Sequence, residues 1–312
     1  MRYVWEEGFR LNRSQGYIAS ATVGLSFILI FSYVLKSTGM SSFEQLFFRL
    51  LFGLLILLAV MLITKRVRAL KRKHLVFFVV IGFTYAVFAL SGLSAIAFGT
   101  PIPVSVALVY TQPIFTAVIS QATGKERMNL PKALLILVGV LGAFLVSGIS
   151  TTNPVIHLGI VFPVLAGFLY AVYLWLKRRA PVEEYTPYQV LFNTFLFAIP
   201  WLLVVWFVLR NFTEMPFFVG VTMPNSTQLF LLVLFAAFST VLPYGLLNYV
   251  KAEEVSPTTE GLLLLGDPLL HTIWATLFLR QIVSWAQYLG AGLILVSAAL
   301  NLKVRTKTTG KG

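Results

Sequence analysis

The chain has 312 residues, of which 58% are hydrophobic and only 11% are charged, and its formal net charge is +13. Soluble domains carry about 25% charged residues, so this composition excludes a water-soluble globular protein and indicates an integral membrane protein. The absence of cysteine excludes disulfides, thiol catalysis and cysteine-ligated metal sites.

Apolar runs follow one another along almost the whole chain, and a helix needs about 20 apolar residues to cross a bilayer. Residues 1–15 are polar and mixed, so we expect a cytoplasmic N-terminal segment without a cleavable signal peptide. The fold class is predicted to be all-α, because no run alternates polar and apolar residues. Ten runs qualify as membrane-spanning helices: 16–36, 43–64, 75–98, 102–122, 131–149, 157–176, 187–209, 227–249, 257–279 and 284–302.

The basic residues are concentrated in alternate loops. With the N-terminus inside, 20 of the 24 Lys and Arg residues fall in cytoplasmic segments, including the basic tail at 303–312, and three fall in outer loops. This asymmetry is the positive-inside signal. It explains the net charge better than a nucleic-acid partner would, and we expect no such partner. The sequence thus predicts a multi-pass protein of the plasma membrane with both termini in the cytoplasm.

Two stretches of the chain carry the same landmarks in the same order. Gln112 and Pro113 in the fourth run correspond to Asp267 and Pro268 in the ninth, at an offset of 155 residues. Glycine-rich helix ends follow both pairs. Internal repetition over half a chain is typical of transporters.

Each half contains five predicted helices, which is an odd number. Two related halves must therefore have opposite orientations in the membrane. We predict that residues 16–150 and 157–302 form inverted five-helix repeats, separated by a short outer loop. In such proteins the substrate site lies near the midplane, between the repeats.

These features resemble the drug/metabolite transporter superfamily, and specifically its ten-helix EamA-type permeases. The resemblance covers about residues 16–302 and implies alternating-access transport of a small metabolite, with helices one, three, four, six, eight and nine around the site. The chain departs from the family pattern at Gln281 and Asp267, where glutamate is usual. The residues that carry the resemblance are the proline-centred segment 107–113, the turn of Gly124, Glu126 and Arg127, the glycines Gly139, Gly142 and Gly148, and their second-half counterparts.

Asp267 is the only aspartate in the chain and lies about ten residues into the ninth helix, near the midplane. An ionised carboxylate is costly against lipid, so it should face the protein interior or water. Pro268 lacks an N–H group and should bend the helix, as Pro113 should in the fourth. His271 follows one turn later on the same face. The pair could share a proton or bind a cationic group, or it could be a polar contact between helices.

Further candidates for substrate binding or coupling lie on the same helices. Gln112 is the repeat counterpart of Asp267 and offers neutral donors and acceptors. Glu260 precedes Asp267 by seven residues, either as a vestibule acid or as an N-terminal acid stabilised by the helix dipole. The remaining candidates could equally be packing residues or interhelical hydrogen-bond partners: Tyr110, Tyr170, Tyr173, Ser94, Tyr244 and Asn248.

Arg49 lies about two turns into the second helix, and no other Lys or Arg is predicted to lie deep in a span. We expect it to pair with Glu44 or to extend toward the outer surface, and contact with a substrate is the less favoured alternative. Phosphorylated substrates usually need paired cationic groups, so this isolation counts against them. No P-loop is present, so direct ATP coupling is not expected, and no metal or cofactor is predicted.

The sequence therefore predicts a secondary transporter rather than an enzyme, since an aspartyl protease would need a second aspartate. We expect export of a small neutral or cationic metabolite, such as an amino acid or amine, by a monomer or homodimer in the lipid bilayer. Protons are a candidate coupling ion. The alternatives are a passive facilitator, in which Asp267 is structural, a proton-coupled exporter of drugs or many metabolites, and more distantly a channel, scramblase or receptor.

Overall fold

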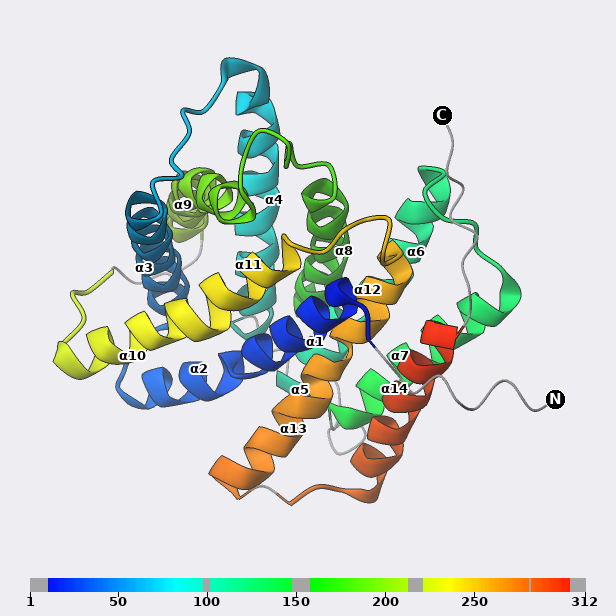
Figure 1. Cartoon of the computed structure of the whole chain (residues 1–312). Helices are drawn as coiled ribbons and strands as arrows, with labels where there is room; N and C mark the ends of the chain where they lie inside the picture. The colour runs from blue at the N-terminus through cyan, green and yellow to red at the C-terminus, as the bar shows by residue number, and fades with distance from the viewer. Residues whose placement is uncertain (1–10, 98–101, 148–157, 213–220, 281, 304–312) are drawn as a thin grey trace.

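The computed structural model describes residues 11–97, 102–147, 158–212, 221–280 and 282–303, and all regular structure in these ranges is helical. Several predicted features lie outside these ranges: the first ten residues, the connection between the two predicted repeats, Gln281 and most of the basic tail. The helices in chain order are α1 (Arg13–Ser26), α2 (Ile28–Ser37), α3 (Ser42–Ile63), α4 (Arg72–Ala97), α5 (Ile102–Val109), α6 (Gln112–Ala122), α7 (Leu130–Val146), α8 (Val161–Lys177), α9 (Pro187–Phe212), α10 (Ser226–Ala236), α11 (Leu242–Leu247), α12 (Pro257–Leu264), α13 (Gly266–Leu279) and α14 (Trp285–Lys303) (Figure 1).

Within the described residues, eight helical segments are long and apolar enough to cross a membrane. Two shorter apolar helices, α7 and α8, complete a set of ten crossings. The predicted all-α integral membrane fold with ten helices is thus confirmed. Several crossings consist of two helices in series, namely α1–α2, α5–α6, α10–α11 and α12–α13.

Polar residues at the ends of the apolar runs set where many of the helices begin. In each of five helices the side chain before the first turn accepts a hydrogen bond from the backbone N–H three residues later, which satisfies a donor that the helix cannot. These capping residues are Asn12, Ser41, Asn129, Asn225 and Ser256.

The fourth and ninth crossings are interrupted at their prolines. α5 ends at Val109 and α6 begins at Gln112, whereas α12 ends at Leu264 and α13 begins at Gly266. A proline has no N–H for the preceding turn and its ring crowds that turn's carbonyl. The break at each proline is a turn of one or two residues whose backbone stays in the helical region at Thr111 and Leu265, so each crossing continues as one span. Gly167 lets α8 approach the first break, since a Cβ there would lie 2.8 Å from the Val109 carbonyl oxygen.

The eighth crossing contains a π-helical turn at Ala237–Val241, between α10 and α11. Pro243 follows directly, so the wide turn falls where a proline interrupts the regular hydrogen-bond ladder. The turn buries Ser239 and Thr240 completely. It places small hydroxyl groups inside the bundle.

The helix contacts come in pairs related by exchange of the two halves. α7 packs against α14 and α3 against α9, and in each case the partners occupy corresponding places in the two halves. The contact of α4 with α8 has its counterpart in that of α11 with α1. Two repeats related by a pseudo-two-fold axis produce this arrangement. Figure 1 shows α7 and α14 side by side, away from α3 and α9.

Glycines allow the closest of these contacts. A Cβ on Gly290 of α14 would lie 2.6 Å from the carbonyl oxygen of Gly142 in α7, and a Cβ on Gly142 would lie 2.8 Å from that of Gly290. Small residues that let two backbones touch are the usual packing device between membrane helices. The α7–α14 pair therefore has no space for larger side chains at its crossing point.

Contacts between loops define the two ends of the bundle. At one end the Arg68 guanidinium donates to the Glu184 carbonyl oxygen at 2.6 Å, which joins the α3–α4 and α8–α9 connections. At the other end the Thr222 backbone N–H donates to the Glu44 carboxylate at 2.9 Å. We call the first end, at which the basic loop residues are concentrated, the inner end, and the other the outer end.

Candidate functional site

Asp267 lies at the break in the ninth crossing, as the second residue of α13, and is 9% exposed. The hydroxyl of Tyr110, from the break in the fourth crossing, donates a hydrogen bond to its Oδ2 atom. His271 Nδ1 lies 3.5 Å from Asp267 Oδ1, which is close for an ion pair but too long for a good hydrogen bond. The carboxylate thus lies where the two interrupted helices meet.

Three polar atoms of this group are buried without a hydrogen-bond partner among the described residues. They are Asp267 Oδ1 and the two ring nitrogens of His271. Buried polar atoms of native proteins almost always have a partner. An acceptor beside two imidazole nitrogens is suited to bind a small polar group or to exchange a proton.

An aromatic cluster extends from this group across the bundle. We define it as Tyr85, Phe88, Tyr170, Tyr173 and Tyr244, from α4, α8 and α11. Tyr170 stacks on Phe88 with ring centroids 4.7 Å apart, and Tyr85 contacts the rings of Tyr173 and Tyr244 at 5.4 and 5.3 Å. Electron-rich ring faces of this kind attract organic cations.

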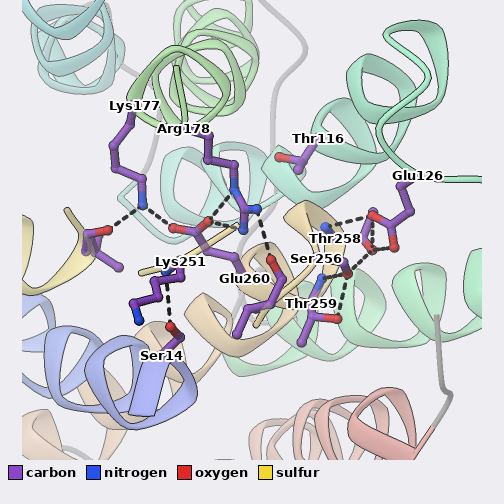
Figure 2. Close-up of polar contacts among 12 residues, drawn as sticks. Ser14, Thr116, Glu126, Lys177, Arg178, Lys251, Ser256, Thr258, Thr259 and Glu260 are labelled. Atoms are coloured by element: carbon purple, nitrogen blue, oxygen red, sulfur yellow. Dashed lines mark hydrogen bonds and ion pairs between the residues drawn. The ribbon is translucent and has the colours of Figure 1, made fainter. Parts of the chain in front are cut away.

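Glu260 lies on α12, nearer the inner end than Asp267, and is completely buried. Lys177 forms an ion pair with its Oε1 atom. Arg178 donates to Oε2 from Nε at 3.0 Å and from Nη2 at 2.7 Å (Figure 2). The two cations also bind the carbonyl oxygens of Leu247 and Val255. Every polar atom of this carboxylate therefore has a charged partner.

A second set of contacts, which we call the inner network, joins the first half to the start of α12. It consists of Glu126, Lys132, Ser256, Thr258 and Thr259. The Thr258 hydroxyl donates to the Glu126 carboxylate at 2.7 Å, and Lys132 forms an ion pair with Glu126 (Figure 2). Lys132 also donates to the Ser256 hydroxyl at 3.3 Å. The glycine-containing turn after α6 is thereby fastened to the ninth crossing.

A cavity of about 140 Å³ lies between α6, α8 and α12 at the inner end. Exposed residues of the inner loops, Lys125 and Arg179, also border it, so it faces the inner side. Glu260 is the one carboxylate among the described residues that line the cavity. Its lining includes Thr116, Ser120, Trp175, Arg178, Ser256 and Glu260.

Comparison with known proteins identifies the family. The sequence pattern of the EamA-like transporter family matches residues 14–148 and 157–303. The chain belongs to the EamA-like transporter family. It is thereby a membrane transporter of the drug/metabolite transporter superfamily, and the two matched segments are the family's two repeats.

Solved structures show the same fold. One solved structure, titled "Crystal structure of protein", superposes on this chain with a TM-score of 0.74. The match covers 93% of this chain and 96% of the other. The two sequences are 14% identical, so this likeness concerns the fold alone. No curated protein matches the sequence significantly.

Several predicted site residues of this EamA-like transporter lie apart from the Asp267 group. The Gln112 amide donates to the Thr116 hydroxyl at 2.5 Å, on the inner half of the fourth crossing. Asn248 caps the end of α11 at the inner end and donates to the Pro187 carbonyl oxygen at 3.3 Å. Ser94 is buried within α4. Tyr110 and His271 contact Asp267 directly, and Tyr170 and the other two predicted tyrosines belong to the aromatic cluster.

The expectation for Arg49 was wrong. It is 8% exposed, and its guanidinium carbon lies 5.0 Å from the ring centroid of Phe235. Glu44 instead accepts hydrogen bonds from Ser41 and Thr222. Arg49 points into the bundle because Glu44, which caps its own helix, is already satisfied at the outer end.

The sequence also gave no warning that cations at helix ends are buried. Lys177 follows an apolar run and is 5% exposed, and Lys132 lies at the start of another and is 1% exposed. At both places the sequence pattern predicts solvent-exposed loop charges. The available signal was Glu260, because an acid inside a membrane helix needs a cationic partner. Among the described residues no group of three His, Asp or Glu side chains is placed to hold a metal ion.

Proposed function

We propose that this EamA-like transporter exports a small neutral or amine-bearing metabolite, such as an amino acid, and that Asp267 is its central substrate or proton site. One observation carries the proposal. The carboxylate lies where the interrupted helices of both repeats meet, and its own Oδ1 and both ring nitrogens of His271 are buried without a hydrogen-bond partner among the described residues. A site at the repeat interface is where secondary transporters of inverted-repeat architecture bind their cargo.

Alternating access would use the two breaks as joints. The inner halves of the two interrupted crossings, α6 and α12, pack against each other, and the inner network holds the start of α12. Movement of α12 away from α6 would extend the inner cavity toward Asp267. The Tyr110–Asp267 contact would then be exposed to the cytoplasm, from which cargo would enter.

A proton is the second candidate occupant of the site. Asp267 Oδ1 and His271 Nδ1 face each other at 3.5 Å, so one proton could be held between them. Binding of a substrate amine would then compete with that proton, which is the basis of exchange between the two. The passive facilitator is the alternative in which Asp267 has no exchangeable occupant.

We also propose that residues 16–150 and 157–302 are the two domains, with both termini in the cytoplasm of a cell whose plasma membrane holds the protein. The charge asymmetry supports this orientation. We propose that it acts in that membrane as a monomer or homodimer.

Flux through proteoliposomes tests the proposal. Vesicles are loaded with amino acids, amines, bases and sugars, a pH step is imposed, and efflux is read by mass spectrometry. We expect Asp267→Asn to lower efflux of the transported class by at least about tenfold, because a charge-assisted contact is lost, and to abolish its response to pH. Glu253→Gln, which changes an exposed acid of an inner loop, is the matched control.

Two results would contradict the proposal. Efflux that Asp267→Asn leaves unchanged, in rate and in pH response, would favour a facilitator with a structural aspartate. Loss of efflux in the Glu253→Gln control as well would show that the assay reports protein damage rather than the site.

A further inference from the structure

Arg49 is a buried cation without an anionic partner. Its side chain enters the bundle from α3, and among the described residues no carboxylate lies within ion-pair distance of it. Its Nε atom is buried and makes no hydrogen bond to the described residues. Arg49 contacts aromatic residues instead. Its guanidinium carbon lies 5.0 Å from the ring centroid of Phe235, and the hydroxyls of Tyr85 and Tyr244 interact with it electrostatically.

A guanidinium group cannot avoid the cost of this position by losing its proton, since arginine stays charged in proteins. A charge inside a membrane protein is costly unless it is paired or lines a polar path. The ring of Phe235 offsets only part of that cost, because cation–π contacts are weaker than an ion pair with a carboxylate. The site thus has an unmet requirement for negative charge.

The polar side chains that the structure describes near Arg49 are neutral hydroxyls, which can donate or accept a hydrogen bond, and not carboxylates. Ser239, in the π-helical turn, is fully buried, and its hydroxyl has no partner among the described residues. α3 packs against this turn, and a Cβ on Gly53, one helical turn beyond Arg49, would lie 3.5 Å from Val241 of the turn. Tyr85 adds a third donor from α4. A buried guanidinium with hydroxyl groups on two neighbouring crossings has the donors that an anion needs.

We infer that Arg49 forms an anion-binding site that takes the carboxylate group of the transported molecule. This inference rests on the proposed function for the source of the carboxylate. Asp267 and Arg49 both border the aromatic cluster, through Tyr170 and Tyr85 respectively. The aromatic cluster therefore borders a negative site for an amine and a positive site for an acid, and the two sites together select molecules that carry both groups over those that carry an amine alone.

A small inorganic anion such as chloride presents the same charge and could occupy the site instead. The test therefore separates the two sources. Full-length protein in proteoliposomes is assayed with pairs of an amino acid and its amide, which differ only in the carboxylate: phenylalanine, leucine and lysine with their amides. Each pair is measured in chloride and in chloride-free methanesulfonate.

The variants are Arg49→Met, Arg49→Lys and Tyr85→Phe. Arg210→Met is the matched control, because Arg210 also lies over an aromatic ring, that of Trp206 at 5.2 Å, but is exposed at the outer end. We expect wild type and Arg210→Met to prefer an amino acid over its amide by at least about tenfold in kcat/KM. Arg49→Met should remove the preference by raising KM for the acid while leaving flux of the amide unchanged, and Arg49→Lys should keep part of it.

Binding is measured separately from transport, as the change in unfolding temperature of the detergent-purified protein when sodium acetate or sodium chloride replaces sodium sulfate at constant ionic strength. An increase in wild type and Arg210→Met that is absent in Arg49→Met supports the anion site, and the anion with the larger effect identifies the source. If neither acetate nor chloride raises the unfolding temperature of wild type, the inference is overturned. This binding result is independent of transport, so it can be read even if no amino acid or amide is transported and the proposed function fails.

Other outcomes are equally decisive. Equal loss of acid and amide flux in Arg49→Met, with an unchanged response to both anions, would make Arg49 a structural residue and leave the Asp267 proposal intact. If Arg49→Met does not fold, Arg49→Lys and Tyr85→Phe carry the test, since both keep the side-chain volume nearly constant. Full retention of acid preference and of anion response in both would overturn the inference.

Discussion

Glu260 and Asp267 are two buried carboxylates that lie seven residues apart on the ninth crossing. They differ in how many hydrogen-bond and ion-pair partners their oxygen atoms have. Glu260 is held by Lys177 and Arg178, whose remaining donors bind backbone carbonyl oxygens. Asp267 has one hydroxyl partner and a histidine just beyond hydrogen-bonding distance. Burial alone therefore does not distinguish a structural acid from a binding acid.

The difference follows from what each carboxylate can do without rearrangement. Any ligand that approached Glu260 would have to displace a lysine or an arginine, and separating a buried ion pair is costly. A ligand at Asp267 would gain a contact that no described residue now supplies. Glu260 is thus suited to fix α12 against α8, and Asp267 to exchange partners.

The largest expected effect is on stability, from Glu260→Gln. This change leaves two buried cations without their anion, which typically costs about 3–5 kcal/mol. Asp267→Asn should cost less than about 1 kcal/mol, since the amide oxygen can still accept from Tyr110. Unfolding temperatures and size-exclusion profiles in detergent measure both.

The double variant Glu260→Gln with Lys177→Met is the control for this comparison. It removes one of the stranded cations and should recover part of the lost stability. If Glu260→Gln and Asp267→Asn destabilised the protein equally, the distinction between the two carboxylates would be lost.

A smaller effect is expected from Tyr110→Phe, which removes the one hydrogen bond that Asp267 accepts from the described residues. Losing a hydrogen bond to a charged group costs about 1.5–3 kcal/mol. We expect flux in proteoliposomes to fall by about tenfold, and the unfolding temperature to fall by less than in Glu260→Gln. Tyr173→Phe, in the aromatic cluster but without contact to Asp267, serves as the comparison, and an equal loss of flux there would point to general packing.

The smallest effect concerns a partly exposed carboxylate, Glu184 in the inner loop after α8. Hydrogen bonds from Lys71, Lys73 and His74 hold its pKa at about 2, below the ordinary value of 4.5. A depressed pKa means that the ionised group stabilises the folded state above pH 4.5 and that this contribution is lost as pH falls from about 4.5 to about 2.

Glu184→Gln lacks this contribution. The difference in unfolding temperature between wild type and the variant should therefore be constant above pH 5 and shrink as pH falls below 4.5. The difference is expected to be small, because exposed ion pairs contribute little. A difference that grew on acidification would assign the effect to another group.

The sequence was sufficient for the features that depend on local pattern. Long apolar runs predicted the ten crossings, and Pro113 and Pro268 marked where two of them are interrupted. The depth and isolation of Asp267 suggested that it would face away from lipid, and the structure leaves it only 9% exposed. Each of these follows from hydropathy or backbone chemistry within a few residues.

Features that depend on helix rotation and on distant partners could not be predicted. Lys177 and Arg178 precede Glu260 by 83 and 82 positions, and only the packing of α8 against α12 brings them together. The direction of Arg49 depends on which face of α3 meets α10 and α4. A helical pattern in a uniformly apolar run carries no amphipathic signal that would fix that rotation.

The contact of Gly142 with Gly290 has a practical consequence for measuring motion. Backbone touches backbone at this point of α7 and α14, so the two helices cannot slide past each other without a clash. Spectroscopic labels placed on these helices, in a chain whose lack of cysteine makes every introduced thiol unique, would report a distance that stays constant through the transport cycle. The distance between α7 and α14 would therefore serve as an internal reference for measuring the displacement of α6 and α12.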